Sequence, residues 1–125
     1  MITKISRITV IAATLAATIG MSGRASAAGA LAVNKCGAYG YSYNYASDAE
    51  ASEAALRNCQ GDECHVVANV TGACAAFYWD DNDHCGAQGW GYANSRAEAE
   101  GIAAKYCADY GGANCVLRAW VCDGS

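Results

Sequence analysis

The sequence predicts a small α+β domain made of two ββαβ-like repeats, with a mostly antiparallel sheet, two helices and disulfide staples. Two observations carry this prediction. First, the stretch over residues 47–59 recurs over residues 95–107: each copy opens with Ser, has Glu three residues later, runs through alanines and ends on Cys. Ser followed by Glu at this spacing is a capping box and marks a helix start. Second, all eight cysteines lie beyond residue 35, distributed over both copies.

Self-similarity at a fixed offset indicates that each unit stacks on its twin because it cannot bury its apolar face alone. The helix positions match at an offset of 48, whereas Cys36-Gly-Ala and Cys85-Gly-Ala match at an offset of 49. One residue is therefore inserted in the first unit between Tyr43 and Ser47. We expect the two repeats to span about residues 29–72 and 73–123 of one domain.

The first 27 residues have the pattern of a secretory signal peptide. Lys4 and Arg7 precede an apolar run over residues 8–21, and small residues at 25–27 form a cleavage site. This run is shorter than the roughly 20 residues that span a membrane, and no Cys follows the cleavage site to carry a lipid anchor. We therefore expect residues 28–125 to be secreted, or to stay in the periplasmic or cell-envelope space, without membrane insertion.

The net charge of the chain without its leader limits the classes of partner that it is expected to bind. Removing the leader takes away three basic residues and no acidic ones, which leaves five Lys or Arg against twelve Asp or Glu, so the formal net charge falls from −4 to −7. A domain of this charge is repelled by the phosphates of nucleic acids and by anionic lipid headgroups. The expected partner is a protein, or an envelope or host component, and not a nucleic acid.

The first unit begins with a short apolar strand over residues 30–33. Residues 39–45 then alternate tyrosine with small or polar residues, and period two with aromatic residues predicts a strand with one aromatic face. A helix follows the Ser47 cap, with a stripe of small residues at Ala51, Ala54, Ala55 and Cys59. We expect this stripe to lie close on a sheet, with the tyrosines as its large partners. Residues 65–70 form a β-branched strand.

The second unit repeats this order. Residues 74–79 and 88–93 are expected strands, separated by a polar loop over residues 80–86. A helix follows the Ser95 cap with the apolar stripe Ala99, Ile102, Ala103 and Tyr106. Residues 115–122 form the last strand. The chain has no proline and no low-complexity linker, so residues 28–125 are expected to be a single domain.

An even number of cysteines in a small exported chain indicates a disulfide framework. Because a duplicated unit should repeat its local bridge, Cys59 is expected to pair with Cys64, and Cys107 with Cys115. The remaining pairs are then Cys36–Cys85 and Cys74–Cys122, both expected to tie the two units together. A zinc site using Cys64-His65 and His84-Cys85 is the alternative; it is disfavoured because oxidising compartments favour disulfides, and no metal is expected.

The motifs Gly-Ala-Leu-Ala-Val, Gly-Tyr-Ser-Tyr-Asn-Tyr and Ser-Asp-Ala-Glu-Ala, with the second copy Gly-Trp-Gly-Tyr-Ala-Asn-Ser-Arg-Ala-Glu-Ala, resemble those of the exported bacterial and mycobacterial domain of unknown function 4189. The resemblance covers essentially the whole of residues 28–125. It implies secretion and a compact α+β domain. It brings no catalytic residues to assign to this chain.

The tyrosine strand is the most conspicuous candidate surface. Tyrosine is frequent at binding surfaces because it offers a rigid ring with a polar tip. A sugar or protein platform could therefore be formed by Tyr39, Tyr41, Tyr43 and Tyr45 with Trp90 and Tyr92. The simpler interpretation, which we favour, is that the helices cover this face and the rings fill the core.

The acidic loop with Asp80, Asp81 and Asp83 suggests a calcium site, because hard cations prefer several oxygen ligands. The series breaks at Cys85, where a third ligand would fall, so a solvated acidic loop is favoured. In the same loop His84 adjoins Asp83, the one place where an acid and a base are neighbours. This pair supports a hydrolase only weakly, since general acid–base chemistry needs groups that converge in space.

The sequence therefore predicts a secreted, non-enzymatic binding protein with no catalytic residues and no cofactor. Its expected contact surface consists of the tyrosine strand, Trp90 and the loop over residues 80–83. Two alternatives stay open: a small secreted hydrolase that acts on envelope polymer through His84 and neighbouring acids, and a structural component of the envelope.

Overall fold

The computed structural model describes residues 27–123, so the predicted signal peptide, apart from Ala27, lies outside the described residues. The elements follow one another as two equivalent series. The first unit contains β1 (Ala28–Val33), β2 (Tyr39–Tyr45), α2 (Asp48–Asn58) and β3 (His65–Val70). The second contains β4 (Ala73–Asp80), β5 (Gln88–Ala93), α3 (Arg96–Asp109) and β6 (Cys115–Asp123).

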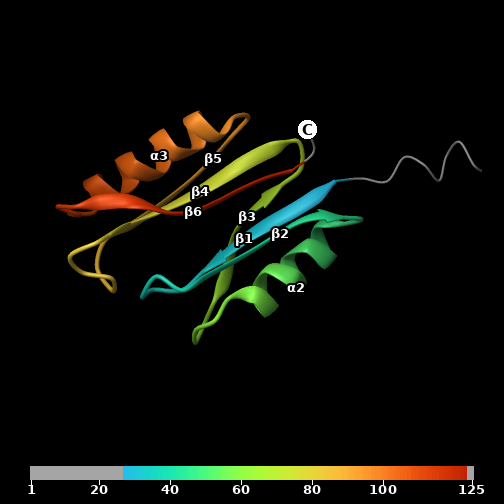
Figure 1. The fold of residues 1–125 in the computed structure, drawn as a ribbon, viewed down its shortest axis with the longest axis horizontal. Helices are drawn as coiled ribbons and strands as arrows, with labels where there is room; N and C mark the ends of the chain where they lie inside the picture. The colour runs from blue at the N-terminus through green and yellow to red at the C-terminus, as the bar shows by residue number, and fades with distance from the viewer. Residues whose placement is uncertain (1–26, 124–125) are drawn as a thin grey trace, which may run out of the picture.

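The six strands form two antiparallel sheets of three strands each, in the orders β2-β1-β3 and β5-β4-β6. The sheets face one another and a helix covers each outer face, so the layers run α2, first sheet, second sheet, α3 (Figure 1). The predicted α+β class with two ββαβ units is confirmed. The strands divide into two sheets instead of one because each unit completes its own ladder, and the units then meet through sheet faces.

Large and small side chains are segregated between the layers. The inner faces of the sheets bring together the largest buried side chains, among them Leu31, Val33, Val70, Phe77 and Trp79. Beneath the helices the buried residues are only alanines and cysteines. Burying a Leu, Val or Phe side chain stabilises a fold by about 1.5–3 kcal/mol. The hydrophobic stabilisation is therefore concentrated between the sheets, which is also where the two units meet.

Each helix lies directly against glycines of an edge strand. A Cβ atom on Gly40 of β2 would lie 2.3 Å from the carbonyl oxygen of Ala55, and one on Gly89 of β5 would lie 2.2 Å from that of Ala103. Such close approach of two backbones requires glycine. The helices thus contact the small face of each edge strand. This corrects the expectation that the tyrosines of β2 are the large partners of the first helix, which holds for Tyr45 alone.

The apolar stripe predicted for α2 is confirmed, since Ala51, Ala54, Ala55 and Cys59 are all buried. In α3 the buried residues are Ala99, Ala103 and Cys107, whereas Ile102 and Tyr106 are 38% and 49% exposed. The prediction was wrong for these two residues. Because β5 has glycines where α3 packs on it, the two backbones lie so close that only small residues fit between them. The larger side chains of Ile102 and Tyr106 therefore lie on the flank of the helix.

Both helices begin where the capping boxes predict. The Ser47 hydroxyl accepts a hydrogen bond from the Glu50 amide at 3.2 Å, and the Ser95 hydroxyl accepts one from the Glu98 amide at 3.2 Å. The Ser95 hydroxyl also donates to the Glu98 carboxylate at 3.2 Å. Each bond satisfies an amide that has no partner within the helix.

The residue inserted in the first unit forms a β-bulge. The register between β1 and β2 shifts between Ala28 and Ala30, whereas β4 and β5 pair without a shift. Within this bulge Asn44 adopts φ 69°, a left-handed conformation that asparagine tolerates better than most residues. Its amide donates to the carboxylate of Asp123 on β6. The insertion thereby links the edge strands of the two units.

The eight cysteines are paired as Cys36–Cys85, Cys59–Cys64, Cys74–Cys122 and Cys107–Cys115. Only Cys36–Cys85 joins the two units. Cys74 and Cys122 are directly opposite one another on the neighbouring strands β4 and β6, so their bridge lies within the second unit. This corrects the expectation that two bridges tie the units together.

We expect Gly89→Ala to destabilise the protein by about 1–3 kcal/mol, because the added methyl group overlaps the backbone of α3. Gly101→Ala is the matched control. Nothing lies within 4 Å of a Cβ added at Gly101, which lies inside α3, so this change should stabilise the protein by up to about 1 kcal/mol. Denaturant unfolding of both variants measures the two effects. Equal effects of the two substitutions would contradict the close helix–strand contact.

Replacing Ser47 or Ser95 by Ala should each lower the free energy of unfolding by about 1 kcal/mol, because one amide of each helix start loses its acceptor. Thermal and denaturant unfolding of the two single variants give this value. Exchange to Asp at the same positions preserves an acceptor and serves as the control. If both alanine variants were as stable as the wild type, these hydroxyls would not cap the helices.

Candidate functional site

Three tyrosines of β2, Tyr39, Tyr41 and Tyr43, lie on the face turned away from α2, whereas Tyr45, beyond the bulge, packs against the small residues beneath α2. Tyr41 and Tyr43 are 41% and 59% exposed, and Tyr39 and Tyr45 are half-buried. The interpretation that the helices cover this face and bury the rings is therefore wrong for Tyr39, Tyr41 and Tyr43. The cause is the alternation itself: Gly40 and Ser42 occupy the helix-facing positions, so the rings must emerge on the opposite side of the strand.

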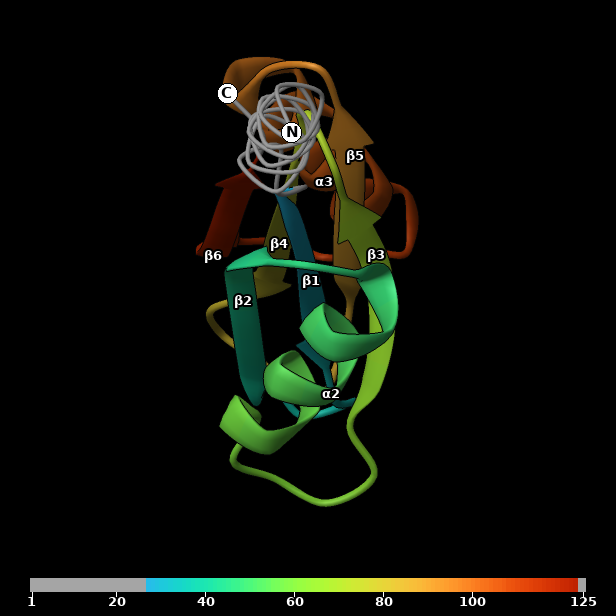
Figure 2. The same ribbon diagram turned by 90° about the vertical axis from the view of Figure 1, so that its right-hand side faces the viewer.

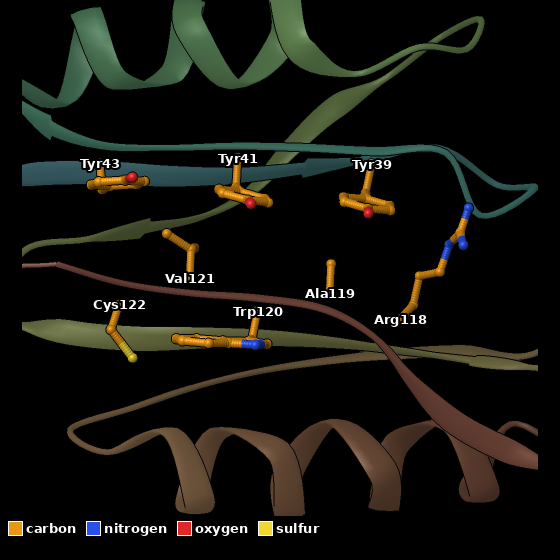
Figure 3. Close-up of a pocket in the computed structure, with 8 residues that line it drawn as sticks. All are labelled: Tyr39, Tyr41, Tyr43, Arg118, Ala119, Trp120, Val121 and Cys122. Carbon is orange, nitrogen blue, oxygen red and sulfur yellow. The ribbon is translucent and has the colours of Figure 1, made fainter.

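These rings form one wall of an open groove of about 430 Å³ between the edge strands β2 and β6. Figure 3 shows Tyr39, Tyr41 and Tyr43 side by side along β2, seen nearly edge-on, with Ala119 and Val121 of β6 facing them. The centroids of the first two rings are 6.4 Å apart and their planes differ by 3°. The wall is therefore a nearly flat aromatic platform, with the backbone between the rings held in place by β1.

Arg118 closes one end of the groove (Figure 3). It is the unpaired residue of a β-bulge in β6, between Leu117 and Ala119, and bulges redirect side chains. Its Nε donates to the carbonyl oxygen of Gly37 at 3.1 Å. Its guanidinium carbon lies 4.9 Å from the ring centroid of Tyr39 and 3.9 Å from that of Trp79, distances typical of cation–π contacts.

Trp120 and Cys122 also line the groove, but their side chains point away from the tyrosines toward α3 (Figure 3). The ring of Trp120 is held by Arg96 of α3, whose guanidinium carbon lies 3.8 Å from the ring centroid. Sequence reasoning missed both Arg118 and Trp120. The available signal was the single basic residue within the otherwise apolar run of residues 116–121.

The predicted contact surface does not form one continuous site. Figure 2 shows β2 and β6 on one side of the sandwich and β3 and β5 on the other. Trp90 lies on β5, where its ring makes an edge contact with His65 of β3 at a centroid distance of 6.2 Å. Together with Asp80 and Asp83 it lines a separate, shallow hollow. The tyrosine platform and the acidic loop are therefore distinct surfaces.

Asp80 organises the acidic loop from a buried position. Its carboxylate accepts hydrogen bonds from the amide of Asn82 at 2.9 Å and from the amide of Ala113 at 3.3 Å. The loop is thus joined to the turn that follows α3. Both oxygens of this buried carboxylate already have donors. Within residues 27–123, no group of three His, Cys, Asp or Glu side chains is placed to hold a metal ion.

His84 contacts Trp79 and Asp81. Its ring stacks on Trp79 with centroids 3.7 Å apart and planes 8° apart, and its Nε2 lies 3.4 Å from Asp81, not beside the carboxylate of Asp83. All eight cysteines are in disulfides, which leaves no thiol nucleophile. The contacts of His84 hold the loop against the edge of the core.

The ion pair between Lys105 and Asp109 on α3 shifts the pKa of the lysine. The carboxylate of Asp109 accepts a hydrogen bond from the Lys105 ammonium at 2.8 Å and raises the pKa of that lysine. Both side chains are exposed on the helix surface and do not line the groove. Separately, none of the helices in the described range is long and apolar enough to span a membrane.

Comparison with known proteins places the domain in a family. No curated protein and no solved structure matches the chain at a significant level. Residues 28–122 match the family model described as a domain of unknown function, DUF4189. This match spans both ββαβ units and confirms the resemblance seen in the repeated motifs. The chain therefore belongs to the DUF4189 family.

Proposed function

We propose that this protein is a secreted, non-enzymatic binding protein that holds an uncharged carbohydrate chain of the cell envelope in the groove between β2 and β6. The observation that carries the proposal is the platform formed by Tyr39, Tyr41 and Tyr43. Their rings line an open groove, in which Tyr41 and Tyr43 are exposed and Tyr39 packs in part against the core between the sheets. Concave aromatic surfaces with a few polar groups are the usual form of a ligand site.

The flatness of the platform favours a sugar over other ligands. One face of a pyranose ring is lined by C–H groups, which carry a slight positive charge and are attracted to the negative face of an aromatic ring. The parallel planes of Tyr39 and Tyr41 suit consecutive sugar rings of an extended chain. The remaining N–H groups of Arg118 and the tyrosine hydroxyls are positioned to bond sugar hydroxyls at the rim.

The net negative charge of the domain favours an uncharged ligand. The described residues contain five basic and twelve acidic side chains, a net charge of −7, which disfavours a polyanion. The cation nearest the platform, Arg118, is already shared between Tyr39, Trp79 and Gly37. The four disulfides and the leader-like sequence of residues 1–27 support action outside the cytoplasm.

The double variant Tyr41→Ser/Tyr43→Ser should bind short soluble, uncharged oligosaccharides derived from chitin about tenfold or more weakly than the wild type. Each ring contact contributes about 0.5–1.5 kcal/mol, and 1.4 kcal/mol corresponds to a tenfold change in affinity. Calorimetric titration measures the affinity, and circular dichroism checks that the variant is folded.

Tyr110→Ser is the matched control, because Tyr110 is 72% exposed and lies outside this groove. Its affinity should equal that of the wild type. The proposal fails if the wild type binds none of these sugars, or if the double variant binds as well as the control. Release of sugar fragments that is abolished by His84→Ala would instead favour the hydrolase.

A further inference from the structure

Because the chain is an internal repeat, the edge strand β5 and its helix α3 can be compared residue by residue with β2 and α2. With the offsets of 48 and 49, Ile102 and Tyr106 of α3 occupy the positions of Ala54 and Asn58 of α2. Ala54 is buried, and the Asn58 side chain donates to the carbonyl oxygen of Tyr41 on β2 at 3.0 Å. The first unit therefore presents a small and polar flank beside its edge strand. The second presents two large apolar side chains at the same place.

An apolar surface results along β5. Its exposed side chains are those of Trp90, Tyr92, Ile102, Tyr106 and Tyr110, and with Gln88 and the glycines of β5 they line a hollow of about 570 Å³. None of these lining residues carries a charge. A contiguous apolar surface of this kind on an acidic domain marks an interaction site.

The backbone of β5 is also open to pairing. In the first unit the carbonyl of Tyr41 points away from β1, since it accepts the hydrogen bond from Asn58. Trp90 is the counterpart of Tyr41, and Tyr106 stands where the asparagine would be. Among the described residues no side chain donates to the carbonyl of Trp90. Residues 88–93 contain no charge and no proline, the devices that usually protect an edge strand from pairing.

We propose that β5 and α3 form the interface of a homodimer, in which β5 of one copy pairs antiparallel with β5 of a second copy. A twofold axis at Trp90 places Trp90 opposite its counterpart and Gln88 opposite Tyr92 of the second copy. The two β5-β4-β6 sheets then continue as one sheet of six strands. The row Ile102, Tyr106 and Tyr110 meets the same row of the neighbouring α3 above that seam.

Charge and area argue for a second copy as the occupant. Two domains that each carry −7 repel one another least where they meet without charge, and the residues that line the hollow along β5 carry none; Asp80 and Asp83 lie in the neighbouring hollow. A half-exposed aromatic side chain leaves on the order of 100 Å² open, so the five side chains offer roughly 500 Å² per copy. Two copies bury about 1,000 Å², the lower limit for a specific interface, to which the strand hydrogen bonds add.

Sedimentation velocity over a range of protein concentrations tests the dimer, using protein that was expressed with its leader and recovered after export. The wild type should reach twice the monomer mass as concentration rises. Ile102→Ala/Tyr106→Asn, which installs the residues of the first unit, should raise the dimer dissociation constant by about tenfold or more. Both side chains are exposed, so thermal unfolding should show that the variant is folded.

Two charge insertions form a matched pair: Tyr92→Lys on β5 should abolish the dimer, and Tyr43→Lys at the equivalent position on β2 should not. A wild type that stays monomeric throughout overturns the proposal, even if the surface binds another protein. So does a double variant that dimerises like the wild type. A dimer that is lost in Tyr43→Lys and kept in Tyr92→Lys overturns it as well, since the interface would then lie on the other edge.

Discussion

The contact between each helix and the backbone of its edge strand determines how the rest of the domain is arranged. A Cβ atom on Gly40, Gly89 or Gly91 would lie 2.2–2.3 Å from a helix carbonyl oxygen, so no side chain can separate the two backbones. The buried hydrophobic residues beneath the helices are therefore alanines and cysteines. The large side chains of the edge strands must then leave on the opposite face. That face is covered by the second sheet only in part, and the rings of β2 and β5 consequently border open grooves.

The two units are joined chiefly by the packing between the sheets, with polar contacts at its ends. At one end the Arg118 guanidinium reaches from the second unit to the carbonyl of Gly37 in the first. Gly37 has φ 88°, and a Cβ added to it would lie 2.1 Å from the Trp79 ring, so the turn closes directly over that ring. At the other end Asp123 accepts from the amide of Asn44. Both contacts depend on a bulge, and a bulge aims a backbone or side-chain group out of the regular ladder.

Much of the fold could be predicted from local patterns. The capping boxes predicted the helix starts, and alternation or β-branched runs predicted the strands. The offset between repeats placed an inserted residue between Tyr43 and Ser47, where the structure has the bulge at Asn44. The division into two sheets could not be predicted, because alternation shows that a strand has two faces and does not show which strands it pairs with. The same ambiguity misassigned the tyrosines of β2: tyrosine and glycine faces alternate equally well, and close helix contact selects the glycines. Arg118 was missed because its role depends on Gly37 and Trp79, which are distant in sequence.

The disulfides differ greatly in how far apart their cysteines lie along the chain. Cys59–Cys64 and Cys107–Cys115 close loops with separations of 5 and 8 residues, whereas Cys74–Cys122 and Cys36–Cys85 span 48 and 49. The entropy of loop closure grows with the logarithm of length, so the long loops cost about 2 kcal/mol more than the shortest before folding brings their ends together. Oxidative folding therefore favours the two short-range bridges early, each between a helix and the strand that follows it within one unit. The Cys36–Cys85 bond can form only after the two units have packed together, so its formation follows assembly of the sandwich.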